Sequence, residues 1–275
     1  MNATKPEFRP SGVITLTTDL GPRGPFVATM KGVILSRFPD AKIIDLTHEI
    51  PVQWPAEAAF WLSHAYRYFP QGSVHVAVVD PGVGTSRDII AGVRDGHAFI
   101  APDNGQLGSI LGELTGNPTS PVHRVDLSRL QHFRISRPSV TFHGRDIIAP
   151  LAADLASGTL DLDDLGPATP EIVPSWVEEP TVTRARVSGV VITIDSFGNL
   201  YTNIDGRHSR PLRKPIVHVG GHDVRVCRTY ADVKPGEYVA LINSFGVLEI
   251  ARAEQRAADG LGVGRGAPVT VRELG

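Results

Sequence analysis

The chain has 275 residues, of which 41% are hydrophobic and 20% are charged, and its formal net charge is −2 at pH 7. These values are typical of a globular protein with a sizeable core, and the small charge argues against nucleic acid or a membrane surface as the partner. Cys227 is the one cysteine, which excludes a disulfide within the chain and fits the reducing cytoplasm.

Residues 1–12 are expected to form a disordered tail, and no apolar stretch reaches the roughly 18 residues that a transmembrane helix needs. Beyond the tail, apolar segments alternate between strand and helix patterns. The predicted strands cover 13–18, 42–46, 74–79, 97–100 and 123–125, and the predicted helices cover 26–37, 56–68 and 146–156. This alternation predicts an α/β domain over residues 13–165, with a mixed, mostly parallel sheet and helices on both of its faces.

The second half of the chain has a different pattern. Residues 166–183 are rich in proline and are expected to form a linker. Short apolar segments with turn residues between them then predict strands at 186–194, 216–219, 238–242, 248–251 and 269–271. No clear helix is expected apart from a turn near 254–258. The pattern predicts an all-β, barrel-like domain over residues 184–275.

Two aspartates stand where predicted strands end. Asp19 follows the first strand and Asp80 follows the third, and α/β sheets bind ligands beyond the carboxyl ends of their strands. Asp80 opens a glycine- and proline-containing loop that ends at Arg87, and its unusual backbone path can hold the carboxylate close to the guanidinium. A tight turn with a surface ion pair is an equally good interpretation of this loop alone.

Two further motifs combine polar and ionisable side chains. The run 141–146 (Thr-Phe-His-Gly-Arg-Asp) precedes an apolar helix. Either Asp146 or a neighbour caps this helix and His143 is structural, or His143 has a functional role. The run 195–203 follows a strong strand and forms either a hairpin turn or an aromatic, polar pocket for a flat ring. His218 and His222 flank two glycines that predict a turn, so no metal site is expected there.

These motifs together are more specific than any one of them. The chain contains Thr18-Asp19-Leu20-Gly21 with Met30-Lys31-Gly32, and then further blocks at 45–50, 80–87, 101–105, 141–146, 197–199 and 243–246. In this order they resemble the adenosyl-forming S-adenosyl-L-methionine (SAM) hydrolases, also called SAM hydroxide adenosyltransferases, which are relatives of the fluorinase and chlorinase. The resemblance spans Val13 to Val271.

The resemblance implies an activity and a set of residues. SAM is the substrate, adenosine and L-methionine are the products, and no cofactor or metal is needed. A homotrimer is implied, with SAM between the N-terminal domain of one subunit and the C-terminal domain of its neighbour. The implied catalytic residues are Asp80, Arg87 and His143. The implied substrate-binding residues are Asp19 (ribose), Thr141 and Phe142 (the channel near the reacting carbon), Asp195 (ammonium), Asn199, Tyr201, Ala251 and Arg252 (adenine) and Ser244 (carboxylate).

The sequence departs from the family pattern at one position and leaves two alternative functions open. Relatives commonly carry an acid five places after the aspartate at Asp19, where this chain has Gly24. A SAM-dependent halogenase is one alternative, although the Asp80 carboxylate would repel a halide. A non-catalytic SAM- or adenosine-binding protein is the other. A Rossmann dinucleotide enzyme is not expected, because no G-x-G-x-x-G follows the first strand.

Overall fold

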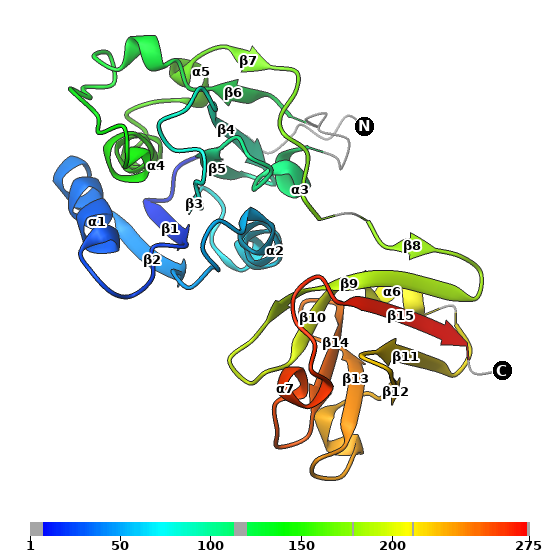
Figure 1. Cartoon of the computed structure of the whole chain (residues 1–275). Coiled ribbons are helices and arrows are strands. Elements are labelled where there is room, and N and C mark those ends of the chain that lie inside the picture. Colours follow the sequence, from blue (N-terminus) through cyan, green and yellow to red (C-terminus); the bar gives the residue numbers. More distant parts are fainter. Residues whose placement is uncertain (1–7, 113–119, 178, 211, 274–275) are drawn as a thin grey trace. The chain divides into compact units, whose positions relative to one another are not determined.

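The computed structural model describes residues 8–112, 120–177, 179–210 and 212–273. The chain forms two compact units, Met1–Trp176 and Val177–Gly275, and each is described by itself (Figure 1). None of the described helices combines the length and the apolar character that crossing a bilayer requires.

The first unit is built on a seven-stranded sheet with the order β2-β1-β3-β5-β4-β6-β7. Its strands are β1 (Val13–Thr18), β2 (Lys42–Thr47), β3 (Val74–Val78), β4 (Ile89–Arg94), β5 (His97–Pro102), β6 (Val122–Arg124) and β7 (Ala168–Thr169). β2, β1, β3 and β5 pair in parallel, whereas β4 pairs antiparallel with both β5 and β6, and β7 pairs antiparallel with β6. The mixed, mostly parallel sheet of the sequence analysis is confirmed.

Helices cover both faces of this sheet (Figure 1). They are α1 (Phe26–Arg37), α2 (Pro55–Ala65), α3 (Gly108–Leu111), α4 (Ala149–Ser157) and α5 (Leu162–Leu165), with a π-helical turn at Gly144–Ile148 and 3-10 turns at Tyr66–Tyr68 and Leu127–Arg129. Successive strand residues point to opposite faces. Val76 of β3 accordingly lies in the core cluster that includes α1 and α4, whereas its neighbour Ala77 lies in the cluster that includes α2 and α3.

The parallel strands end at one edge of the sheet, where the polar loops gather. Thr18 of β1 pairs with Val78 of β3, so Asp19 and Asp80 leave the sheet side by side. The loop after β5, which begins at Asp103, leaves from the same edge. Both aspartates were predicted at strand ends, and the parallel pairing of β1 with β3 brings these two ends together.

Two predictions for the ends of the first domain need correction. Of the expected tail, residues 1–7 lie outside the described residues, but Phe8 packs against the core and the Ser11 N–H donates to Gly72 O at 2.9 Å. Of the expected linker, residue 178 lies outside the described residues, but Ile172 is buried in the core. Apolar side chains outweigh the prolines there, because burying them stabilises the segment on the first unit.

The second unit is an antiparallel, nearly closed barrel with the strand order β12-β11-β15-β9-β10-β14-β13, and β8 pairs with β9. Its strands are β8 (Thr181–Val182), β9 (Arg186–Ile194), β10 (Leu200–Asp205), β11 (Pro215–Val219), β12 (His222–Arg225), β13 (Tyr238–Ile242), β14 (Val247–Arg252) and β15 (Pro268–Glu273). The Cys227 N–H donates to Ala240 O at 2.8 Å, which joins the chain after β12 to β13. Residues 274 and 275 of the predicted domain lie outside the described residues.

Some elements were not predicted. They are β4, β7, β8, β10, β12, α3, α5, α6 (Gly206–Ser209) and the 3-10 turns at Leu127–Arg129 and Tyr230–Asp232. The helix α7 (Ala257–Leu261) overlaps the end of the turn expected near 254–258. β10 shows the reason, since Asn203 and Asp205 are of residue types that are rare in strands and favoured a loop. The signal was nevertheless present, because Leu200 and Ile204 are fully buried while the intervening Tyr201 and Asn203 are not.

Two neighbouring strands of the first unit, β3 and β5, carry a pair of buried histidines, His75 and His97. His75 Nδ1 is 2.8 Å from the Thr15 hydroxyl, and His75 Nε2 is 3.1 Å from His97 Nδ1. Burial, and to a smaller extent the nearby His97, lowers the pKa of His75 to about 3. The folded state therefore keeps this imidazole neutral at pH values at which an unfolded chain protonates it.

From this pair we predict that the first unit loses stability as the pH is lowered. Between pH 6.5, the ordinary pKa of histidine, and pH 3 the unfolded state binds the extra proton, so stability falls as the pH is lowered. One such group contributes up to about 1.4 kcal/mol per pH unit. Urea unfolding followed by tryptophan fluorescence measures this, because Trp54, Trp61 and Trp176 all lie in the first unit.

His75→Gln is expected to reduce the slope of unfolding free energy between pH 6.5 and about 5, because glutamine does not titrate. His132→Gln removes an exposed histidine and is the control, for which the slope should stay. An equal slope in His75→Gln and the unaltered protein would show that the buried pair does not set the acid sensitivity.

Candidate active site

Asp80, Arg87 and His143 contact one another in the first unit. Arg87 Nε donates to Asp80 Oδ1 at 2.8 Å, and Arg87 Nη2 donates to Asp80 Oδ2. The same Nη2 is 3.1 Å from His143 Nδ1. The side chains of Asp80 and Arg87 are only 7% and 10% exposed, so the surface ion pair considered for this loop is excluded.

Glycines allow the 80–87 loop to approach the segment that carries His143. Gly84 has φ +78°, and a Cβ at this position would lie 2.5 Å from Val140 O. Gly144 is equally constrained, because its Cβ would lie 2.8 Å from Val78 Cγ1 on β3. Both contacts need a residue without a side chain, so these glycines set the distance between Asp80 and His143.

His143 stands at the start of the π-helical turn that leads into α4. Such turns are rare and occur frequently at functional sites. Asp146 makes no cap on this helix; its Oδ2 accepts the Ser139 N–H at 2.8 Å and its Oδ1 accepts Arg145 Nε at 2.6 Å. The Asp146 carboxylate thus ties residue 139 back to the helix, which holds the run 141–143 in place.

The surroundings of His143 keep its ring neutral. Burial is the larger cause and the positive charge of Arg87 the next that lowers its pKa. An arginine only donates hydrogen bonds, so Nδ1 is the acceptor in the contact with Arg87. Because Nδ1 accepts from Arg87, the proton of the neutral ring is on Nε2, and His143 offers an N–H rather than a lone pair at that nitrogen.

Asp19 lies at the same edge. Its Oδ2 accepts the N–H of Gln53 at 3.0 Å. Burial raises the pKa of Asp19, and the charge of Asp80 adds to the effect. Asp19 and Asp80 therefore interact through space, as expected for two residues at the ends of neighbouring parallel strands.

The other predicted residues of the first unit lie on the segment just before His143. Thr141 is exposed, and its hydroxyl is 3.0 Å from that of Ser139. Phe142 packs edge-on against Phe26 with 5.8 Å between ring centroids, and the guanidinium of Arg145 lies 5.1 Å from its ring centroid. Phe26, at the start of α1, thus supports the aromatic side chain that precedes His143.

A chain of polar contacts links three of the sequence motifs. Thr18 Oγ1 is 2.9 Å from His48 Nδ1, His48 Nε2 is 3.0 Å from Asp45 Oδ1, and Lys31 Nζ donates to Asp45 Oδ2 at 2.6 Å. Thr18 directly precedes Asp19. The sequence analysis recognised the three motifs but did not predict the contacts between them.

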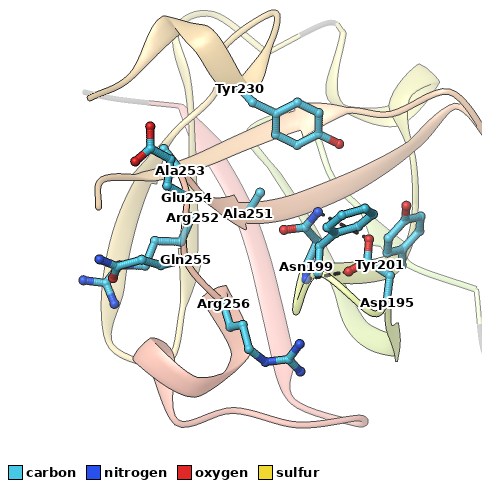
Figure 2. A pocket seen from close by; sticks show the side chains of 11 residues that line it. Asp195, Asn199, Tyr201, Tyr230, Ala251, Arg252, Ala253, Glu254, Gln255 and Arg256 are labelled. Atoms are coloured by element: carbon cyan, nitrogen blue, oxygen red, sulfur yellow. Dashed lines mark hydrogen bonds between the residues drawn. The ribbon is translucent and has the colours of Figure 1, made fainter. Parts of the chain in front are cut away.

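The second unit contains a cavity of about 560 Å³, a common size for a small-molecule site (Figure 2). It lies between the loop after β9 and the end of β14. The residues that line it are Asp195, Phe197, Asn199, Tyr201, Tyr230, Ala251, Arg252, Ala253, Glu254, Gln255 and Arg256. The structure thus brings together five of the six residues predicted on this domain, and it favours a pocket over a bare hairpin turn for the run 195–203.

The loop after β9 is held by its own side chains. Asp195 Oδ1 accepts the Asn199 N–H at 2.9 Å, and Asp195 Oδ2 lies 3.3 Å from Asn199 Nδ2. Gly198 has φ +84°, and a Cβ there would meet Arg256 Cβ at 2.6 Å. Because glycine permits this close approach, the two walls of the pocket pack against each other at their base.

Glu249 and Tyr230 were missed by sequence reasoning. Glu249 is fully buried beside the pocket, where it accepts the Tyr230 hydroxyl at 2.7 Å and the Asn243 amide at 3.1 Å. It also accepts a hydrogen bond from Tyr201. Burial raises the pKa of Glu249. The carboxylate ties both tyrosine hydroxyls down, so it orients two aromatic side chains that line the pocket.

Two predicted residues differ from the rest of this set. Ser244 is exposed in the turn between β13 and β14 and does not line the cavity, although its neighbour Asn243 contacts Glu249. Arg252 lines the cavity while its Nε donates to Gly236 O at 2.8 Å and its guanidinium lies 5.0 Å from the centroid of the Tyr238 ring. Its side chain therefore secures the turn before β13.

The two units match the two domains of one protein family. The family model for the SAM hydroxide adenosyltransferase N-terminal domain matches residues 14–166, and that for the C-terminal domain matches residues 189–270. The chain belongs to the SAM hydroxide adenosyltransferase family. The resemblance stated from the motifs is thereby confirmed.

Relatives match nearly the whole of this chain. The (R)-S-adenosyl-L-methionine hydrolase of Thermus thermophilus is 37% identical, over 92% of this chain and 96% of that protein. A fluorinase of an Actinoplanes species is 29% identical, over 94% of this chain and 97% of that protein. The crystal structure of an uncharacterized conserved protein from Thermotoga maritima superposes with a TM-score of 0.85 at 33% identity, over 94% of this chain and all of that one.

Proposed function

We propose that the chain hydrolyses SAM to adenosine and L-methionine through in-line attack of water on the ribose C5′. The observation that carries this proposal is the buried contact of Asp80, Arg87 and His143 at the carboxyl edge of the sheet. Family membership and the hydrolases among the relatives support the same reaction.

The chemistry of SAM explains what the site has to supply. Carbon C5′ is bonded to a positively charged sulfur, so methionine leaves as a neutral thioether and needs no acid catalyst and no cofactor. The demanding part is to hold a water oxygen in line with the C5′–S bond. Orientation of this kind can lower a barrier by about 7–11 kcal/mol.

The geometry assigns a different part to each member of the trio. Asp80 accepts a hydrogen bond from the water and takes its proton as the C5′–O bond forms and the sulfur keeps the electrons of the C5′–S bond. Arg87 fixes that carboxylate through two parallel contacts. His143 donates its Nε2–H to the water oxygen, since Arg87 holds its Nδ1. The histidine orients the water and is not the base.

Water is a better nucleophile for this site than a halide. An incoming anion beside Asp80 would meet its negative charge, whereas a neutral water donates a hydrogen bond to Asp80 and accepts one from His143. The relatives agree, because the fluorinase is 29% identical and the Thermus thermophilus hydrolase 37%. A binding protein without activity would have no need for the trio.

Substrate contacts follow from the family resemblance and fit the two units. Asp19 would hold the ribose hydroxyls, and Thr141 and Phe142 would line the channel near C5′. In the second unit Asn199 and Tyr201, with the backbone at Ala251 and Arg252, would hold adenine between aromatic walls that Glu249 orients. Asp195 would meet the ammonium and Ser244 the carboxylate of the methionine part, where Gly24 offers no acid.

We also propose a homotrimer in the cytoplasm, with SAM between the first unit of one subunit and the second unit of its neighbour. The water-binding trio and the adenine pocket lie in different units, which fits a shared site. Exposed apolar side chains of the first unit support an interface between copies: Phe26 at the start of α1 is 50% exposed, Trp54 just before α2 44%, and Ile44 on the edge strand β2 41%. A lone cysteine fits the reducing compartment.

Asp80→Ala is expected to lower turnover by at least about 10²-fold while SAM affinity stays within a few-fold, because the carboxylate acts on the water and not on SAM. Isothermal calorimetry with SAM and adenosine release measure the two effects. Asp88→Ala is the matched control: it removes a neighbouring carboxylate paired with Arg124 at 2.8 Å, and it should leave turnover unchanged. Lost binding with retained turnover in Asp80→Ala would refute the assignment.

His143→Gln separates a hydrogen-bond donor from a base. The glutamine amide can present an N–H near the position of Nε2, so turnover should stay within about tenfold, whereas His143→Leu should lose about 10²-fold or more. The unaltered enzyme should keep its turnover as the pH falls to 6.5, since the lowered pKa keeps the ring neutral. Equal inactivity of the glutamine and leucine variants, both folded, would mean that the ring takes the proton.

A further inference from the structure

Two amide side chains hold the backbone of Val79, the residue directly before Asp80. Gln106 Oε1 accepts the Val79 N–H at 3.2 Å, and Gln106 Nε2 donates to Val79 O at 3.0 Å. Asn104 Nδ2 donates to the same carbonyl at 2.8 Å. Gln106 Nε2 also donates to Asn104 Oδ1 at 2.9 Å, which couples the two amides.

These contacts take the place of the hydrogen bonds that a neighbouring strand would make to Val79, where the pairing of the sheet ends. β3 and β5 pair in parallel up to Val76 and Ile100, and Val79 lies beyond the last paired residues. Its buried N–H and C=O still need partners. The fully buried amide of Gln106 supplies both, as a neighbouring strand would, and so extends the fixed part of the backbone to the edge of the catalytic loop.

We infer that Asn104 and Gln106 are positioning residues for Asp80, and this inference rests on the proposed function. The carbonyl of Val79 and the nitrogen and Cα of Asp80 belong to one planar peptide unit. Donors that fix this carbonyl therefore fix the plane from which the Asp80 side chain extends. The carboxylate then reaches Arg87 in one orientation, with its remaining lone pairs toward the water.

The loop that carries these two amides is itself bonded to the segment 173–176. Trp176 Nε1 donates to Asn104 O at 2.6 Å, and Asp103 Oδ1 accepts the Val173 N–H at 2.9 Å. Gly105 has φ +91°, and a Cβ there would lie 2.6 Å from Trp176 Cδ1. The segment 173–176 thus holds the backbone of residues 103–105 in place, which gives the Asp-Asn-Gly motif a physical role that the reaction alone does not explain.

Asn104→Ala is the decisive variant, because Val79 O keeps its bond to Gln106 while one of the two donors that fix the peptide plane is lost. A misplacement of about 1 Å can cost 10²-fold in rate, so kcat should fall at least about tenfold. The KM for SAM and the affinity for adenosine should stay within about twofold, because neither amide is expected to contact the substrate. Trp176→Phe, a milder change, should lower kcat in the same direction.

Asn203→Ala is the matched control, because Asn203, the last residue of the run 195–203, does not line the cavity. Asn203 Oδ1 accepts the Val190 N–H at 2.8 Å in the second unit, so this variant also loses an amide–backbone bond, and its melting temperature should fall while its kcat stays within about twofold. If Asn104→Ala keeps kcat while Asp80→Ala loses it, the positioning role is refuted and the proposed function stands. Retained turnover in Asp80→Ala would refute the proposed function itself.

Discussion

The bidentate ion pair between Asp80 and Arg87 is the interaction on which the site depends. Burying two charges costs several kcal/mol per ion, and only close contacts of good geometry offset that cost. Here one guanidinium contacts both carboxylate oxygens and also His143, so it fixes an acceptor and a donor together. The glycine contacts at 84 and 144, the tie from Asp146 and the amides at Val79 all serve to hold these three side chains.

The two units contribute different physical environments to the proposed reaction. The first presents charged groups at the carboxyl edge of a parallel sheet, which is where α/β folds bind ligands. The second presents a pocket with Tyr201 and Tyr230 in its wall, both tied to the buried Glu249, which suits a flat base. In the proposed reaction this division separates recognition of adenine from orientation of water, so we expect that each can be changed by mutation without the other.

Local patterns predicted most of the framework, since alternating strands and helices fix a parallel sheet and place Asp19 and Asp80 at one edge. Contacts between distant residues could not be predicted: Arg87 and His143 lie 56 positions apart, and Asn104 and Val79 lie 25 apart. β10 was missed because Asn203 and Asp205 favour turns. The proline-rich segment was predicted as a linker, yet Ile172 and Trp176 pack on the first unit, because tertiary contacts override local composition.

The central claim is that this site delivers water to C5′. The most direct measurement is to incubate the purified protein with SAM in heavy-oxygen water, with and without chloride, and to analyse the nucleoside product by mass spectrometry. The account predicts adenosine with the label in its 5′-hydroxyl and no effect of chloride. Chlorodeoxyadenosine, or adenosine without the label, would contradict it.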